Sequence, residues 1–199
     1  IPLPAVLGTG APQRNAADLE TKGFELVLGW KDKVGENFKY NVSFNLADHR
    51  SFITKYDLNP TNDLRYYYVG REIGEIWGYE TEGLYQTDAE AAAVNNSKLG
   101  NYKWLAGDVK YKDLDGNNEI NWGNNTLDKP GDRKIIGNSQ ARYTFGLNLG
   151  GEYKNLDFTI FFQGVGKRDA VLGGAYFWGF TNEWDVPATN QLDHWTPDN

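Results

Sequence analysis

The stretch FKYNVSFNLA, residues 38–47, alternates apolar and polar side chains without a break. Side chains of a β-strand point alternately to its two faces, so this run predicts a strand with one apolar and one polar face. Neither a helix nor an irregular loop produces this spacing. The apolar face carries Phe38, Tyr40, Val42, Phe44 and Leu46.

The same alternation occurs in three further segments. Residues 24–31 precede the first run, and the short connection between the two contains Gly35, so 22–49 is predicted to be a β-hairpin. Residues 143–149 and 156–162 repeat the pattern around a turn near Lys154, which predicts a second hairpin at 141–164. Phe161 is the one aromatic residue on the polar side of its run.

The connection between the hairpins, residues 50–140, is long and rich in Gly, Asn and Asp. Residues 165–199 after the second hairpin are predicted to be a further loop region, without alternation after Leu172. Compact soluble domains seldom contain such a connection. Outer-membrane barrels combine short periplasmic turns with long extracellular loops. The chain is therefore predicted to be all-β, an antiparallel transmembrane β-barrel fragment, although a soluble β-sandwich or Greek-key barrel would show the same alternation.

Two details favour the barrel. Small uncharged residues dominate the polar faces, as a water-filled lumen requires, and aromatic residues gather near strand ends, as they do at membrane interfaces. The lumen-type residues are Asn41, Ser43, Asn45, Thr144 and Asn148, and the aromatic ones are Trp30, Phe38, Tyr40, Tyr143 and Tyr153.

Composition excludes several classes of function. A net charge of -7 argues against nucleic-acid binding, which needs clustered Lys and Arg. The 199 residues contain no cysteine and only two histidines, His49 and His194, so disulfides, zinc thiolate sites and histidine-based catalytic sites are not expected. No nucleophile, base and orienting group can be assembled from spacing, and the sequence predicts no enzyme. Residues 1–13 lack the features of a signal peptide.

One short helix is expected inside the long connection. In residues 87–96 (TDAEAAAVNN), Thr87 can cap the helix, Glu90 follows three positions later, and alanines continue the turn.

Residues 113–124 (DLDGNNEINWGN) have the spacing of an EF-hand-type calcium loop. Gly116 precedes the usual glycine position, which Asn118 occupies, and the last position is an amide instead of a bidentate glutamate. An Asx-rich turn that binds no metal is the alternative. The predicted ligands of a structural calcium are Asp113, Asp115, Asn117, Glu119 through its backbone carbonyl, Asn121 and Asn124.

Residues 173–184 (GGAYFWGFTNEW) concentrate aromatic rings near amide and carboxylate groups. Such rings stack on sugars or on a partner protein, so Tyr176, Trp178 and Trp184 are candidate ligand-binding residues. Rings that pack over the mouth of a barrel within their own loop would have the same composition.

Eight stretches, in this order along nearly the whole chain, together resemble the C-terminal barrel portion of SusC/RagA-type TonB-dependent transporters of Bacteroidetes. They are NAADLETKGFELVLGW (15–30), YNVSFNL (40–46), IWGYETEGLYQ (76–86), GDVKYKDLDGNNEIN (107–121), GDRKIIG (131–137), RYTFGLNL (142–149), FFQGVGKRD (161–169) and HWTPDN (194–199).

The resemblance implies import of oligosaccharides, or in some members peptides, across the outer membrane of a gram-negative bacterium. It implies a SusD-like surface lipoprotein that caps the barrel, TonB acting through a plug outside this chain, outer-membrane lipid around the wall, and extracellular loops. It also places the acidic loop at 113–124 where relatives have an Asp/Asn/Gly-rich stretch, and it implies that the chain is a piece of a larger barrel. The alternative is a secreted soluble carbohydrate-binding or adhesive β-domain stabilised by calcium.

Overall fold

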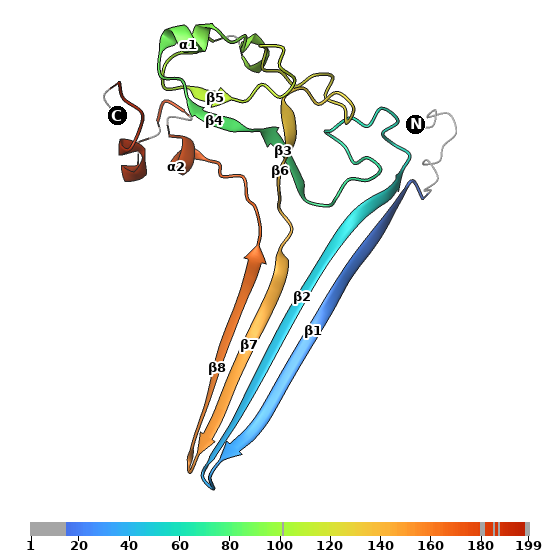
Figure 1. Cartoon of the computed structure of the whole chain (residues 1–199), viewed down its shortest axis with the longest axis vertical. Coiled ribbons are helices and arrows are strands. Elements are labelled where there is room, and N and C mark those ends of the chain that lie inside the picture. The colour runs from blue at the N-terminus through green and yellow to red at the C-terminus, as the bar shows by residue number, and fades with distance from the viewer. Residues whose placement is uncertain (1–14, 101, 180–181, 185, 187, 198–199) are drawn as a thin grey trace.

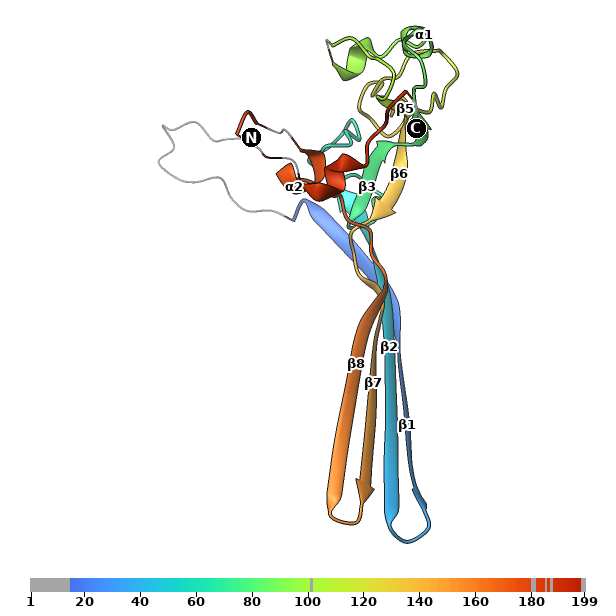
Figure 2. The ribbon, with the colours of Figure 1, turned by 90° about the vertical axis from the view of Figure 1, so that its left-hand side faces the viewer.

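The computed structural model describes residues 15–100, 102–179, 182–184, 186 and 188–197. Two long hairpins stand side by side, and a smaller folded region, here called the upper region (residues 57–141), lies at one end of them (Figures 1 and 2). The hairpins are β1 (Ala17–Val34) with β2 (Phe38–Tyr56), and β7 (Arg142–Tyr153) with β8 (Leu156–Lys167). The class is all-β, with very little helix.

The long strands form one antiparallel sheet in the order β1-β2-β7-β8. They include the four alternating segments of the sequence but are longer. β2 runs to Tyr56 and β8 to Lys167, past the predicted hairpin ends at 49 and 164. The extra length of β8 arises because pairing with β7 continues to Arg142 opposite Lys167. The loop region after the second hairpin therefore begins at 168 instead of 165.

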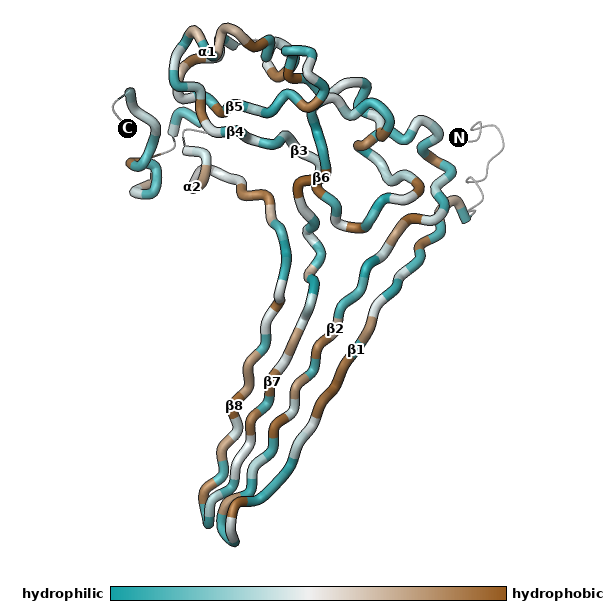
Figure 3. Tube along the Cα trace, in the orientation of Figure 1, coloured by the Kyte–Doolittle hydropathy of each residue, from teal (hydrophilic) through white to brown (hydrophobic). Residues whose placement is uncertain are grey.

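The register of the sheet gathers the alternating residues into two continuous faces. Leu28, Phe44, Leu147 and Phe162 lie side by side across the four strands on the apolar face. The next row, on the polar face, is Gly29, Ser43, Asn148 and Phe161. Figure 3 shows apolar residues recurring along each of the four long strands. Nearly all of those on β1 and β8 are exposed to solvent. A sheet that folds alone in water normally covers such a face.

Glycines let side chains lie flat across this sheet. A Cβ at Gly150 would stand 2.4 Å from Nδ2 of Asn41, and one at Gly146 would stand 2.5 Å from Oδ1 of Asn45. On the apolar face, a Cβ at Gly151 would stand 2.5 Å from ring atoms of Phe158, so this ring lies over the glycine. The amides of the polar face therefore lie over bare backbone of the neighbouring strand.

The upper region has its own small sheets, so it is more ordered than the composition of residues 50–140 suggests. β3 (Glu75–Tyr79) pairs with β6 (Arg133–Asn138), and β4 (Thr81–Leu84) pairs with β5 (Val109–Tyr111). Its buried side chains include Tyr85 and Ile120, which are fully inaccessible to solvent. A short 3-10 helix, η2, spans Ser97–Leu99.

The helix expected after Thr87 is present as α1 (Asp88–Ala92), and the Thr87 hydroxyl accepts a hydrogen bond from the Glu90 N–H at 3.1 Å. The prediction that it extends to residue 96 is wrong. Asn95 leaves the helix because its N–H donates to the Asn118 carbonyl and its own carbonyl accepts from the Ile120 N–H. These two bonds attach the end of the helical segment to the acidic loop.

Where β2 outreaches β7, one ion pair joins the two strands and another joins β2 to the upper region. Arg142 donates to both carboxylate oxygens of Asp48, at 2.5 and 2.6 Å, and Arg50 pairs with Glu72 through bonds of 2.9 and 2.5 Å. The upper part of β2 also exchanges backbone hydrogen bonds with residues 70–73. The end of β2 therefore holds the upper region through an ion pair and backbone hydrogen bonds.

Behind these pairs, a polar cluster is buried inside the upper region. Tyr68 and Trp77 both donate to the carboxylate of Glu75, which is nearly inaccessible to solvent. Burial, followed by the hydrogen bond to Glu75, raises the pKa of Tyr68 to about 12. The tyrosine therefore remains protonated and donates to the glutamate throughout the physiological range.

The C-terminal segment contains α2 (Ala175–Trp178) and the 3-10 helix η3 (Thr189–Leu192) and returns to the upper region. The ring of Trp195 lies against Gly107, where a Cβ would come within 2.8 Å of it. No helix among the described residues is long and apolar enough to cross a membrane.

Candidate functional site

The acidic loop of residues 113–124 brings part of the predicted calcium ligand set together. Carboxylate oxygens of Asp113 and Asp115 lie within 4.8 Å of each other and of a third carboxylate, that of Asp132. Asp132 is fully buried, Asp113 is half-buried and Asp115 is exposed. The sequence interpretation missed Asp132 as a ligand, although it stands in the GDRKIIG stretch.

The remaining predicted ligands are placed differently. The side-chain oxygen of Asn117 accepts from the Glu119 N–H at 2.7 Å, and that of Asn121 accepts from the Gly123 N–H at 2.7 Å. The Glu119 backbone carbonyl accepts from the Asn121 side-chain amide at 3.2 Å, and Asn124 is exposed. Asp113, Asp115 and Asp132 therefore form the most compact set of oxygen donors in this loop.

Backbone N–H groups hold two of the carboxylates in position. Asp132 accepts from the N–H groups of Leu114 and Asn121, at 2.9 and 2.8 Å. Asp113 accepts from Asn118 and Gly116, both at 2.7 Å. Burial acts to raise the pKa of Asp113, but these N–H donors together lower it below its usual value.

This geometry suits a hard cation. Three carboxylates at such short separations repel one another, and Ca²⁺ prefers oxygen ligands of this kind. The backbone also fits, because Gly116 and Asn118 both adopt positive φ, 75° and 60°. Asn118 tolerates the conformation that glycine takes in an EF-hand loop.

The aromatic segment contributes a second candidate surface. Phe177 and Trp178 make an edge-to-face contact with ring centroids 4.9 Å apart, and Trp178 is 65% exposed. With Leu192 and His194 they line a hollow of about 600 Å³. Trp184, 84% exposed, is not among the residues that line it, and the side chain of Tyr176 lies outside the described residues.

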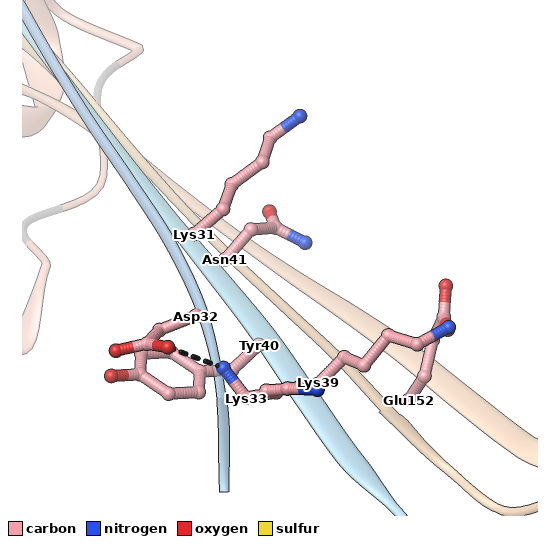
Figure 4. Close-up of a pocket in the computed structure, with 7 residues that line it drawn as sticks. All are labelled: Lys31, Asp32, Lys33, Lys39, Tyr40, Asn41 and Glu152. Carbon is pink, nitrogen blue, oxygen red and sulfur yellow. Dashed lines mark hydrogen bonds and ion pairs between the residues drawn. The ribbon is translucent and has the colours of Figure 1, made fainter. Parts of the chain in front are cut away.

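The two faces of the sheet are most easily distinguished near the turns (Figure 4). Lys31 and Asn41 project from adjacent strands on the polar side, and Asp32 and Tyr40 project on the other. Lys39 pairs with Glu152 across β2 and β7 at 3.0 Å. At the turn end of the sheet, the polar face therefore carries several charged groups, and Asp32 adds one to the apolar face.

Comparison with known proteins gives matches to one kind of receptor. The chain is 30% identical to TonB-dependent receptor P3 of Formosa agariphila, over 81% of this chain and 16% of that receptor. It is 24% identical to TonB-dependent receptor P26 of the same organism, over the whole chain and 20% of the receptor. This chain is related to TonB-dependent receptors. A third relative from this organism, TonB-dependent receptor P39, is 21% identical over 82% of the chain and 18% of the receptor.

These relatives confirm the TonB-dependent receptor resemblance. TonB-dependent receptors are transporters, in agreement with the prediction that the sequence encodes no enzyme. The chain spans a fifth or less of the length of the relatives that it matches. No family model matches the chain.

Proposed function

We propose that the chain forms part of the barrel wall and the extracellular region of a TonB-dependent importer in the outer membrane of a gram-negative bacterium. The observation that carries this proposal is the two-faced sheet, whose apolar rows extend from the turns toward the level of Asp48. In a secreted soluble domain, such a face would remain in water and promote aggregation.

The dimensions of the apolar face suit a bilayer. Residues 24–34 of β1 extend roughly 33 Å at a rise of about 3.3 Å per residue. At a strand tilt of about 40°, this length corresponds to roughly 25 Å along the membrane normal, the height of the apolar band of outer-membrane barrels. The short turns then lie on the periplasmic side and the upper region on the extracellular side.

The polar face suits a water-filled lumen. In the middle of β2 and β7 its residues are small or carry amides, and Asn41 and Asn45 lie over glycines of the neighbouring strand. The outer strands β1 and β8 have unpaired edges within the described sheet. Strands from the rest of the receptor would pair with both edges, because unpaired backbone groups are not tolerated in the hydrocarbon region.

For the cargo, we propose oligosaccharides, with Trp178 and Trp184 as stacking platforms near the extracellular end and a SusD-like lipoprotein as the cap. Exposed indole faces stack on sugar rings, and both rings are exposed. A calcium ion between Asp113, Asp115 and Asp132 would have a structural role, because it would neutralise three carboxylates at the base of an extracellular loop.

Cysteine accessibility in intact cells tests the orientation. The chain has no cysteine, so a single substitution can be introduced at Lys98 in the upper region or at Glu36 in the first turn. Both side chains are exposed. A membrane-impermeant maleimide should label Lys98→Cys in intact cells and Glu36→Cys only after the outer membrane is permeabilised. Equal labelling of both variants in intact cells would refute the proposal.

A further inference from the structure

A hollow in the upper region combines cationic and aromatic groups and has no acidic residue in its lining. It measures about 480 Å³ and is lined by Arg65, Tyr79, Trp122, Asn125 and Arg133. These residues come from four separated parts of the chain, which are the connection after β2, strand β3, the end of the acidic loop with the residue that follows it, and strand β6. In a chain with a net charge of -7, two arginines in one hollow are unexpected.

A close backbone crossing fixes Trp122 and Arg133 beside each other. A Cβ at Gly131 would lie 2.4 Å from the Asn121 carbonyl oxygen and 2.4 Å from the nitrogen of Gly123. The Asp132 N–H donates to the same Asn121 carbonyl at 3.0 Å. Only glycine allows this approach, so the crossing closes residues 123–131 into a loop whose two ends carry the indole and the guanidinium.

The Arg133 guanidinium is oriented but not neutralised. Its Nε donates to the Pro130 carbonyl at 3.2 Å and its Nη2 donates to the Trp122 carbonyl at 3.0 Å. Within the described ranges it has no ion pair with a carboxylate. An arginine held by backbone carbonyls keeps its positive charge available for an anion.

The opposite side of the hollow is also fixed. Asp63 forms a bidentate pair with Arg65, with its shortest contact at 2.5 Å, and accepts from the Asn125 amide at 2.8 Å. The Leu64 N–H donates to the Asn125 carbonyl at 2.8 Å. Arg65 and Asn125 thus form one unit, and the Tyr79 ring packs against that of Tyr111, with centroids 5.1 Å apart.

We propose that this hollow binds an anionic sugar unit, with Arg133 contacting its carboxylate or sulfate group and Trp122 stacking on its ring, while Arg65, paired with Asp63, holds the opposite side in place. Guanidinium groups bind planar carboxylates and sulfate-type oxyanions through paired hydrogen bonds, and an indole face suits a sugar ring. The Asn125 amide can bond to a ring hydroxyl. This inference rests on the proposed import function and narrows the cargo to acidic oligosaccharides.

The test uses the intact receptor purified in detergent and three tetrasaccharides of equal length, one built of uronic acids, one sulfated and one neutral. Calorimetric titration should give affinity for at least one acidic tetrasaccharide about tenfold or more above that for the neutral one, because a hydrogen bond to a charged group contributes that much. Whichever acidic probe binds identifies the anionic group. Equal affinity for all three, or no binding of either acidic probe, would overturn the inference.

Arg133→Gln should reduce the acidic affinity about tenfold or more and leave the weak neutral binding unchanged. Arg168→Gln is the matched control, because Arg168 also donates its Nε to a backbone carbonyl, that of Ser139 at 3.0 Å, and does not line the hollow. If Arg133→Gln disturbs folding, Trp122→Ala provides a second variant, since its exposed indole makes no side-chain hydrogen bond within the described structure.

The acidic affinity should also fall in high salt. If Arg133→Gln and Trp122→Ala, both folded, bind the acidic probes as the parent does, the assignment of this hollow is wrong. That result leaves import itself intact, which uptake by cells measures separately.

Discussion

Placing an arginine on each face of the sheet at the same height should have very different consequences. Leu28 and Val27 are adjacent residues of β1, 56% and 72% exposed, and they point to the apolar and the polar face respectively. Residue 28 is near the middle of the 24–34 segment. If lipid covers the apolar face, Leu28→Arg places a charge near the bilayer midplane.

The size of the effect follows from this position. A charged residue on the lipid face costs about 2–4 kcal/mol at the midplane and about 0–1 kcal/mol near the interface. The lost burial of the leucine adds roughly 1 kcal/mol, about half the value of a fully buried side chain. Leu28→Arg should therefore destabilise the receptor by about 3–5 kcal/mol, whereas Val27→Arg should change its stability by less than about 0.5 kcal/mol.

The assay is the amount of folded receptor in the outer membrane, measured by heat-modifiable migration on gels, with denaturant unfolding in liposomes as the quantitative measurement. Val34→Arg, on the apolar face beside the first turn, gives the depth control and should cost less than Leu28→Arg. Equal loss for Leu28→Arg and Val27→Arg, or no loss for either, would show that the apolar face does not contact lipid.

Gly131→Ala should destabilise the upper region by about 1–3 kcal/mol, because the φ of this residue is 65° and the added Cβ would meet backbone atoms at 2.4 Å. Hydrogen exchange at residues 121–133 should then become faster, whereas Gly173→Ala, at a glycine with open space around it, should have no such effect. The Arg65 guanidinium lowers the pKa of Asp63 from 3.8 to about 2. The stabilisation from this pair should therefore be complete above pH 4 and lost as the pH falls toward 2, where hydrogen exchange at residues 59–67 should become faster. Unchanged exchange between pH 5 and pH 2 would contradict the contribution of this pair. Calcium titration of the intact receptor should release heat, and Asp132→Asn should weaken binding at least tenfold; an unchanged isotherm would remove Asp132 from the ligand set.

The alternation of residues 38–47 contains most of the information that predicts the long sheet. A period of two is a local property, and the register that joins Phe44 to Leu28 and Leu147 follows when the apolar faces of neighbouring strands coincide. The all-β class could therefore be predicted from sequence. The small sheets of the upper region could not, because β3 pairs with β6 across more than fifty residues without alternation in either strand.

The candidate sites were predicted only where their residues are close in sequence. Asp113 and Asp115 stand two positions apart in a recognisable pattern, whereas Asp132 reaches them through the backbone crossing at Gly123 and Gly131. The arginine-lined hollow combines Arg65 with Arg133, and no spacing rule connects two such distant positions. Isolated glycines at 123 and 131 were the only local signal of a close approach.

The junction where β2 outreaches β7 also has a mechanical meaning. The upper region leaves the long sheet from β2 and returns to it at β7. Arg50–Glu72 links β2 to the upper region, and Asp48–Arg142 links β2 to β7 beside it. A sideways load on the upper region is therefore shared by these ion pairs and by the backbone hydrogen bonds between β2 and residues 70–73. Salt screens exposed ion pairs much more than backbone hydrogen bonds, so the stiffness of this junction should decrease as ionic strength rises.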